Sequence, residues 1–107
     1  MKTGAHELLL AAGLAAAWLL PGPAAAATHT VKIEGMQFVP ATLTVQRGDT
    51  IVWQNKDVVP HTATAQGGFD SGNIAAGRKW SHAMKKAGSY DYVCTFHPGM
   101  KAKVVVQ

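Results

Sequence analysis

Short runs in which apolar and polar residues alternate recur along most of the chain. The first three span residues 30–34, 43–46 and 50–55, and turn residues such as Gly35 and Gly48 separate them. A two-residue period is typical of β-strands that bury one face, because successive side chains point to opposite sides. Helical periodicity is absent from these runs. The pattern predicts an all-β fold, an antiparallel sandwich of short strands.

The second half of the chain continues the alternation. Further strands are predicted at residues 62–65, 79–84, 89–94 and 101–106, and a small strand or turn near Phe69. The glycine-rich segment 66–77 is expected to be irregular, with a short helical turn around Ile74 as an open alternative. The chain has 107 residues and no internal repeat, which indicates a single domain.

The phase of the strand predicted at residues 89–94 matters most. Tyr90, Tyr92 and Cys94 fall on one face, so inward packing of the tyrosines would point the thiol into the core at the end of the strand. The predicted core includes both tyrosines together with Phe38, Trp53 and Trp80. His82 lies close to two lysines in the sequence and is expected to face solvent.

The beginning of the chain has the parts of a secretory signal peptide in order. A basic start is followed by an apolar run over residues 8–20, a Pro-Gly-Pro breaker and four alanines that end at Ala27. The run is too short for a membrane-spanning helix, although an uncleaved anchor is an alternative. We expect residues 1–27 to be a cleaved signal peptide and residues 28–107 to form one periplasmic domain. The cut could follow Ala26 or Ala27.

Charge narrows the class of partner. The chain carries 10 Lys and Arg against 6 Asp and Glu, a formal net charge of +4, and its basic residues are scattered without an arginine-rich run. This distribution argues against binding to nucleic acid. It favours an acidic protein partner that is attracted over long range.

The sequence around Cys94 indicates a metal site. Cys94 is the only cysteine, and His97 and Met100 follow it at Cys-x-x-His-x-x-Met spacing. Soft sulfur donors beside imidazole select copper. A fourth donor must come from elsewhere, and His61, which follows an apolar turn with a proline, is the best candidate. Two His and one Cys with a weak axial Met describe a blue copper electron-transfer site; an inert buried thiol is the alternative.

Four motifs together resemble the cupredoxins, most closely the amicyanin and plastocyanin families. They are Gly48-Asp49-Thr50, Pro60-His61, Gly88-x-Tyr90-x-Tyr92-x-Cys94 and the loop from Cys94 to Met100. The resemblance implies a Greek-key β-sandwich with one type 1 copper ion that carries single electrons and is not an enzyme. By the matched positions, the strong ligands are His61, Cys94 and His97. Met100 is the long axial ligand.

Three positions depart from this resemblance. Thr62 stands where those families usually have asparagine, and its hydroxyl is expected to tie the ligand loops together through Thr95. Phe96 replaces a common proline. Its N–H is expected to donate to the Cys94 sulfur and to raise the reduction potential above that of a Phe96→Pro variant. Val93 stands where plastocyanins have a tyrosine, which argues against a second electron exit there.

The same resemblance implies an apolar docking patch around the edge of His97, through which the electron would enter and leave. Its predicted members are Met36, Val59, Pro60, Phe96 and Pro98. Exposed apolar patches mark interaction sites, and weak redox encounters use small interfaces. We therefore expect a monomer that forms short-lived complexes with redox partner proteins, and no association with a membrane after cleavage.

Other functions are alternatives to electron transfer. A periplasmic copper carrier would release its metal readily, and a copper oxidase or nitrite reductase fragment would need a second copper. An interaction sandwich would have no use for these ligands. Cleavage after Ala26 would also leave an Ala27-Thr28-His29 terminus, and a free amine with histidine third is a known chelate for Cu(II).

Overall fold

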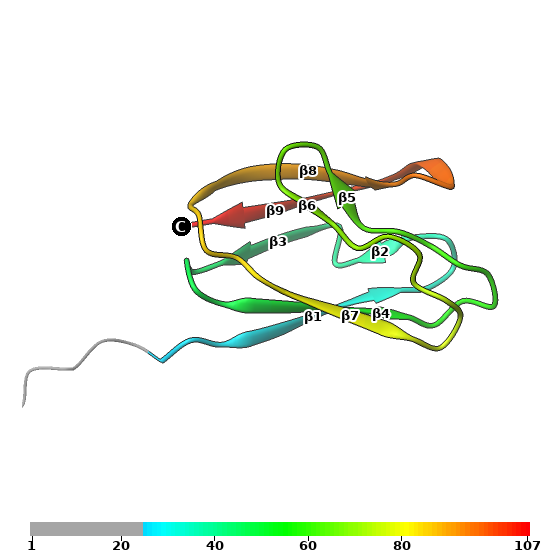
Figure 1. Ribbon diagram of the computed structural model, residues 1–107, viewed down its shortest axis with the longest axis horizontal. Coiled ribbons are helices and arrows are strands. Elements are labelled where there is room, and N and C mark those ends of the chain that lie inside the picture. Colours follow the sequence, from blue (N-terminus) through cyan, green and yellow to red (C-terminus); the bar gives the residue numbers. More distant parts are fainter. Residues whose placement is uncertain (1–24) are drawn as a thin grey trace, which may run out of the picture.

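The computed structural model describes residues 25–107 and shows nine β-strands in that range (Figure 1). They are β1 (Thr28–Ile33), β2 (Phe38–Val39), β3 (Thr42–Val45), β4 (Thr50–Asn55), β5 (Thr64–Ala65), β6 (Phe69–Asp70), β7 (Lys79–Ala83), β8 (Gly88–Cys94) and β9 (His97–Val106). Within the same range no helix is long and apolar enough to cross a membrane. The predicted signal peptide lies outside the described residues except for residues 25–27, so it stays a prediction.

The strands form two sheets that pack as two layers (Figure 1). One sheet has the order β2-β1-β4-β7 and the other β3-β9-β8-β5-β6. The predicted all-β sandwich is confirmed, but the expectation that it is antiparallel is wrong in part. β1 pairs with β4, and β3 with β9, in parallel. Alternation indicates which face of a strand is buried, whereas strand direction depends on the connections between strands.

Aromatic side chains fill the space between the sheets. Trp53 is fully buried, and its ring centroid lies 5.7 Å from Tyr92 and 5.4 Å from Trp80. Phe38 packs edge-on against Tyr92 with centroids 4.7 Å apart. These three buried residues confirm the predicted core, while Trp80 and Tyr90 are half-buried at its margin. Burial raises the pKa of Tyr92 to about 12, so its hydroxyl stays neutral.

The expectation for His82 is wrong, and the open alternative for Ile74 is not observed. His82 is half-buried and its ring stacks on Trp80 with centroids 5.2 Å apart, because residues two apart in a strand share a face. Ile74 forms no helical turn; it makes an isolated bridge with His61. The strand β2 was not predicted, since two residues are too few to show a period.

The two ends of the sandwich differ in what they carry. The loop after β4 and the β8–β9 hairpin meet at one end, on the right in Figure 1. The start of β1 and the carboxyl terminus lie at the opposite end. The predicted metal ligands therefore all belong to one end, and the beginning of the domain lies far from them.

Asp49 closes the turn before β4 at the end without the ligands. Its carboxylate accepts hydrogen bonds from the backbone N–H groups of Ala27 at 2.9 Å and Gln46 at 3.0 Å, and it lies 2.9 Å from Nε2 of His29. These contacts, that of Ala27 foremost, lower the pKa of Asp49 to about 2, although burial acts in the opposite direction. The ionised carboxylate is therefore part of the folded structure.

The melting temperature is expected to fall as the pH drops from 3.8, the ordinary pKa of Asp49, to about 2. The pKa in the folded state is below that of the unfolded chain, so the stabilisation is present above the higher value and is lost on protonation. Thermal unfolding between pH 2 and 6 would show a weaker dependence in Asp49→Asn than in the wild type. Asp91→Asn, at an exposed position, is the control. Equal slopes in the wild type and Asp49→Asn would contradict this assignment.

Candidate metal centre

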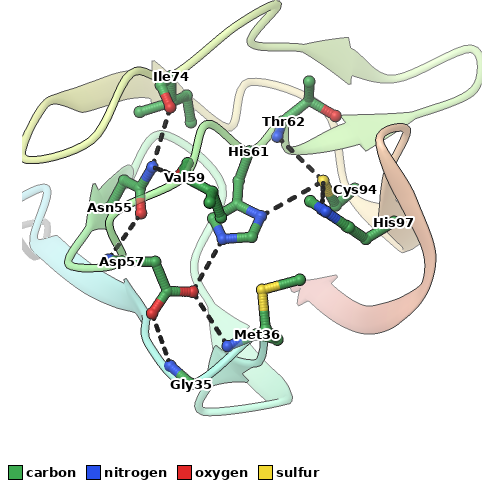
Figure 2. A network of polar contacts seen from close by, with 10 residues as sticks. All are labelled: Gly35, Met36, Asn55, Asp57, Val59, His61, Thr62, Ile74, Cys94 and His97. Atoms are coloured by element: carbon green, nitrogen blue, oxygen red, sulfur yellow. Dashed lines mark hydrogen bonds and ion pairs between the residues drawn. The ribbon is translucent and has the colours of Figure 1, made fainter.

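Three side chains from two loops meet at the ligand end of the sandwich. Sγ of Cys94 lies 3.6 Å from Nδ1 of His61 and 3.6 Å from Nδ1 of His97 (Figure 2). All three donor atoms lie within 4.8 Å of one another. Cys94 and His61 are completely buried, whereas His97 is half-buried. The structure thus brings together the predicted ligand from the loop after β4 and two from the β8–β9 hairpin.

The spacing of these atoms fits a shared metal ion. Donors that bind one metal ion at about 2.0–2.3 Å stand roughly 3.5 Å apart when they surround it. A thiol is a weak hydrogen-bond donor with one hydrogen, so it cannot satisfy two imidazole nitrogens at once. Thiolate sulfur with two imidazoles is a donor set suited to copper. Within residues 25–107, no other group of three His, Cys, Asp or Glu residues has this geometry.

An irregularity in the β8–β9 pairing creates the arrangement. The register is regular up to Val93↔Lys101 and then shifts, so that Cys94 pairs with His97. Had the register continued, Cys94 would face Met100. The shift leaves the residues between His97 and Lys101 as a bulge, a device that re-aims side chains at sites. It places His97 beside the thiol across a two-residue turn.

Met100 is the last residue of the bulge and lies on the inward face of β9. It is 7% exposed and belongs to the buried cluster that contains Cys94. The burial pattern of β9 puts it in phase with the inward-facing Val104 and Val106. Residues three apart in a regular strand point to opposite faces. The bulge is therefore what allows both His97 and Met100 to turn toward the end of β8.

His61 is fixed by its own backbone and by Asn55. Its N–H donates to the carbonyl of Ile74 at 3.1 Å, and its carbonyl accepts from the N–H of Ile74 at 2.8 Å. The buried Asn55 amide donates to the carbonyls of Val59 and Ile74, and its oxygen accepts from the N–H of Asp57 (Figure 2). The loop that carries His61 is therefore held at both ends without any metal.

Asp57 orients the ring of His61, and sequence reasoning missed this residue. Its Oδ2 lies 2.8 Å from Nε2 of His61, and its carboxylate accepts from the N–H groups of Gly35 and Met36 (Figure 2). Burial opposes ionisation, but the hydrogen bonds from Met36, His61 and Gly35 outweigh it and lower the pKa of Asp57. With Nε2 donating to the carboxylate, Nδ1 is left as the lone-pair donor that faces Cys94. The signal that could have found it is an acid four residues before a ligand histidine.

Thr62 joins the two ligand loops, as predicted. Its hydroxyl lies 3.1 Å from that of Thr95 and accepts from the N–H of Thr95 at 2.8 Å. Its own N–H donates to Sγ of Cys94 at 3.3 Å. The expectation that the N–H of Phe96 serves the thiol is wrong, because within the described chain the backbone donor to this sulfur is Thr62. The reason given for a lower potential in Phe96→Pro therefore fails.

The variant Thr62→Val is expected to lose about 0.5–1.5 kcal/mol of unfolding free energy, because it keeps the shape but removes the acceptor of the partly buried N–H of Thr95. Urea unfolding measures the loss. Thr44→Val removes an exposed hydroxyl on β3 and is the control. If the two variants were equally stable, the link between the loops would contribute nothing.

The chain matches the cupredoxin-like domain family over residues 9–106. This range is most of the sequence. The chain belongs to the cupredoxin-like family. The predicted family and the predicted Greek-key sandwich of cupredoxin type are thereby confirmed. The match begins inside the segment predicted to be a signal peptide, so the boundary between residues 27 and 28 stays a prediction.

Individual proteins similar in sequence to this cupredoxin are named amicyanin or plastocyanin. It is 34% identical over 83 residues to amicyanin from Paracoccus versutus, covering 72% of this chain and 63% of that protein. The chain thus spans less than two thirds of that relative's length. Identity to amicyanin-alpha from Methylorubrum extorquens is 31% over 119 residues, covering 100% of each chain. Identity to a plastocyanin from Synechococcus sp. is 35% over 122 residues, covering 92% of this chain and 86% of that one.

Solved structures show the same relationship in three dimensions. An amicyanin mutant in the Cu(I) state superposes with a TM-score of 0.71 at 31% identity, covering 75% of this chain and 82% of that one. An amicyanin mutant with its own tryptophan changed to tyrosine, in the reduced state, gives 0.71 at 31% identity over 78% and 86% of the chains. The sandwich is therefore that of a cupredoxin.

Proposed function

We propose that this cupredoxin is a type 1 copper electron-transfer protein that carries single electrons between protein partners in the periplasm. The observation that carries the proposal is the meeting of one thiol and two Nδ1 atoms within 4.8 Å at the end of a rigid sandwich. Relatives named amicyanin and plastocyanin support a carrier and not an enzyme. Within residues 25–107 there is no second cluster of ligands for a catalytic metal.

The four predicted ligands have separate roles. His61, fully buried and held by Asp57, is the fixed anchor, and Cys94 provides the thiolate. His97 is the ligand nearest to solvent and is the route by which electrons enter and leave. Met100 would provide a weakly bound thioether sulfur to the copper ion. One copper ion is the cofactor, and it supplies the one-electron couple between Cu(II) and Cu(I) when bound.

The surrounding residues hold this ligand set in nearly one arrangement. Asp57 fixes the ring of His61, the amide of Asn55 fixes its loop, and Thr62 ties that loop to the β8–β9 hairpin. A site held by such contacts reorganises little when its charge changes, which favours fast electron exchange. The same rigidity argues against a copper carrier, which must open to release its metal.

An apolar surface around His97 is the docking patch for redox partners. Met36 is 42% exposed, Val59 37% and Phe96 51%, and Pro60 and Pro98 are exposed beside them in the sequence. Val58, which was not among the predicted members, is 92% exposed and extends the patch. Exposed apolar side chains of this kind mark interaction surfaces. Short-lived complexes of a monomer with its partners follow from a small patch of this type.

The proposal is tested by adding Cu(II) to the protein and recording its visible spectrum and voltammogram. An intense charge-transfer band from the thiolate to copper, with a reversible one-electron wave, is the expected result. If the protein bound copper without this intense band, its copper site would not be of type 1 and the proposal would be wrong. Rapid transfer of the metal to a chelator would favour the copper-carrier alternative.

The variant Phe96→Gln is expected to slow electron self-exchange about threefold to tenfold, since loss of an apolar contact near an interface centre costs about 1 kcal/mol or more. Self-exchange is measured by NMR line broadening in mixtures of oxidised and reduced protein, so no partner need be known. Thr44→Gln, on an exposed part of β3, is the matched neutral control. An unchanged rate in Phe96→Gln would place the docking surface elsewhere.

A further inference from the structure

The end of the sandwich opposite the metal ligands holds a second group of polar contacts. The carboxylate of Asp49 lies there, beside the backbone of Ala27 and the ring of His29. Neither contact serves the metal centre, because these residues lie at or directly before the starts of β1 and β4, whereas the ligand loops follow the other ends of the strands (Figure 1). These contacts of Asp49 instead hold the residues at which the mature chain is expected to begin.

Ala27 is the point at which the chain joins the domain. Its N–H donates to Oδ1 of Asp49 at 2.9 Å, and its carbonyl accepts from the N–H of Thr50 at 2.9 Å. Ala25 and Ala26 are exposed and make no hydrogen bond within residues 25–107. Loss of Ala27 would leave the buried carboxylate without one donor and the N–H of Thr50 without its acceptor, a costly state for groups shielded from water.

Asp49 is built to receive a positive group. It is 4% exposed, and its second oxygen is already bonded to the N–H of Gln46 and lies against His29. Its pKa of about 2 means that the carboxylate is charged at every physiological pH. In the existing hydrogen bond only the acceptor is charged, and a charged amine at Ala27 would turn it into a hydrogen-bonded ion pair.

We propose that export processing cleaves after Ala26 and that the Asp49 carboxylate is the receptor for the ammonium group created at Ala27. Water is added across the Ala26–Ala27 bond by a signal peptidase of the export machinery. The carbonyl of Ala26 leaves as a carboxylate with the leader, and the nitrogen of Ala27 takes up protons to become the ammonium. The small residue at position 26 and the one at position 24 suit such an enzyme. The domain thus begins one residue earlier than the predicted boundary at residue 28.

The contacts of Asp49 with Ala27 and His29 also prevent a Cu(II) chelate from forming at the Ala27-Thr28-His29 terminus. An amine-terminal Cu(II) chelate needs the free amine of Ala27 and the ring of His29 on one ion, with the intervening amide nitrogens. Here Asp49 engages both groups, and Thr28 is paired with Thr50 in the sheet. The folded terminus therefore binds no second copper ion, and the protein takes up one equivalent at its metal centre.

The experiment exports the full chain to the periplasm of a bacterial host, isolates the copper-loaded protein and determines its mass. The expected mass is that of a chain that begins at Ala27. The amine is then titrated by NMR. Its pKa is expected to lie about 1 unit or more above the ordinary value of roughly 7.7–8.0. A chain that begins at any other residue, or an amine at Ala27 that titrates at its ordinary value, would overturn the proposal.

Two variants separate a receptor from a merely nearby carboxylate. Asp49→Asn is expected to return the amine pKa to its ordinary value, whereas His29→Gln, which keeps the carboxylate, leaves it raised. A raised amine pKa in Asp49→Asn would overturn the role of Asp49. If Asp49→Asn does not fold, the pKa of the Ala27 amine in the wild type and in His29→Gln still tests the proposal. An ordinary amine pKa in both proteins would show that Asp49 does not receive the ammonium group.

Discussion

Replacement of Cys94 by serine is expected to abolish the intense visible band and the reversible redox wave of the copper-loaded protein. The band depends on a covalent bond between copper and a soft thiolate, and the hydroxyl of serine is a hard, poorly acidic donor at the same place. Serine has nearly the volume of cysteine, and Cys94 is completely buried, so the fold is retained. Absorption spectra and voltammetry of the two proteins at equal copper loading measure the change.

The control for this variant is Met84→Leu, a buried sulfur-containing residue outside the ligand loops that is 3% exposed. It is expected to keep the blue band, because Met84 takes part in core packing alone. Persistence of the band in Cys94→Ser would mean that Cys94 is the inert buried thiol of the alternative interpretation. The proposed function would then be wrong, whatever the family of the fold.

The variant Asp57→Asn is expected to weaken Cu(II) binding about 10- to 100-fold and to raise the reduction potential. Loss of a partner that orients a ligand histidine has about this effect on metal affinity. The amide cannot accept from both Gly35 and Met36 while holding Nε2 of His61, so the ring is less well fixed. Removal of a negative charge beside the site also disfavours the more positive Cu(II) form. Competition with a chelator and voltammetry measure the two effects.

Asp91→Asn changes the net charge by the same amount at an exposed position and is the matched control. Its effect on the potential is expected to be small, because exposed charges are screened by salt and water. Equal shifts in the two variants would mean that Asp57 acts through general charge alone. No loss of affinity in Asp57→Asn would remove its role in orienting His61.

The position of each ligand in the sequence was easier to predict than its geometry. The motif from Cys94 to Met100 is local in the sequence. The alternation in β8 correctly predicted that Tyr92 and Cys94 point inward. The sequence spacing does not show that the β8–β9 register shifts at Cys94, which is what brings His97 to the thiol. A bulge depends on how two strands pair, and the alternation of apolar and polar residues within either strand does not show that pairing.

The contacts around the ligands were harder still. The prediction that Thr62 links to Thr95 was confirmed, since both flank ligands in matched loops. The sequence predicts Phe96, two residues away, as the donor to the thiol, whereas the donor in the structure is Thr62, in the loop between β4 and β5. The role of Asp57 was not predicted, because it depends on hydrogen bonds from the backbone of Gly35 and Met36. These residues lie in the β1–β2 loop and are far from Asp57 in the sequence.

The sequence by itself determined the class of the fold and the chemistry of the donors. Alternation over short runs favours half-buried strands, and thiol, imidazole and thioether at fixed spacing select copper, whatever surrounds them. The tertiary structure decided which strands run parallel and that His61 meets Cys94. It also decided that the carboxylate of Asp57 accepts from the backbone of Gly35 and that of Asp49 from the backbone of Ala27. Periodicity is set by neighbours along the chain, whereas these contacts join residues about 20 or more positions apart, which are brought together only when both sheets close on one core.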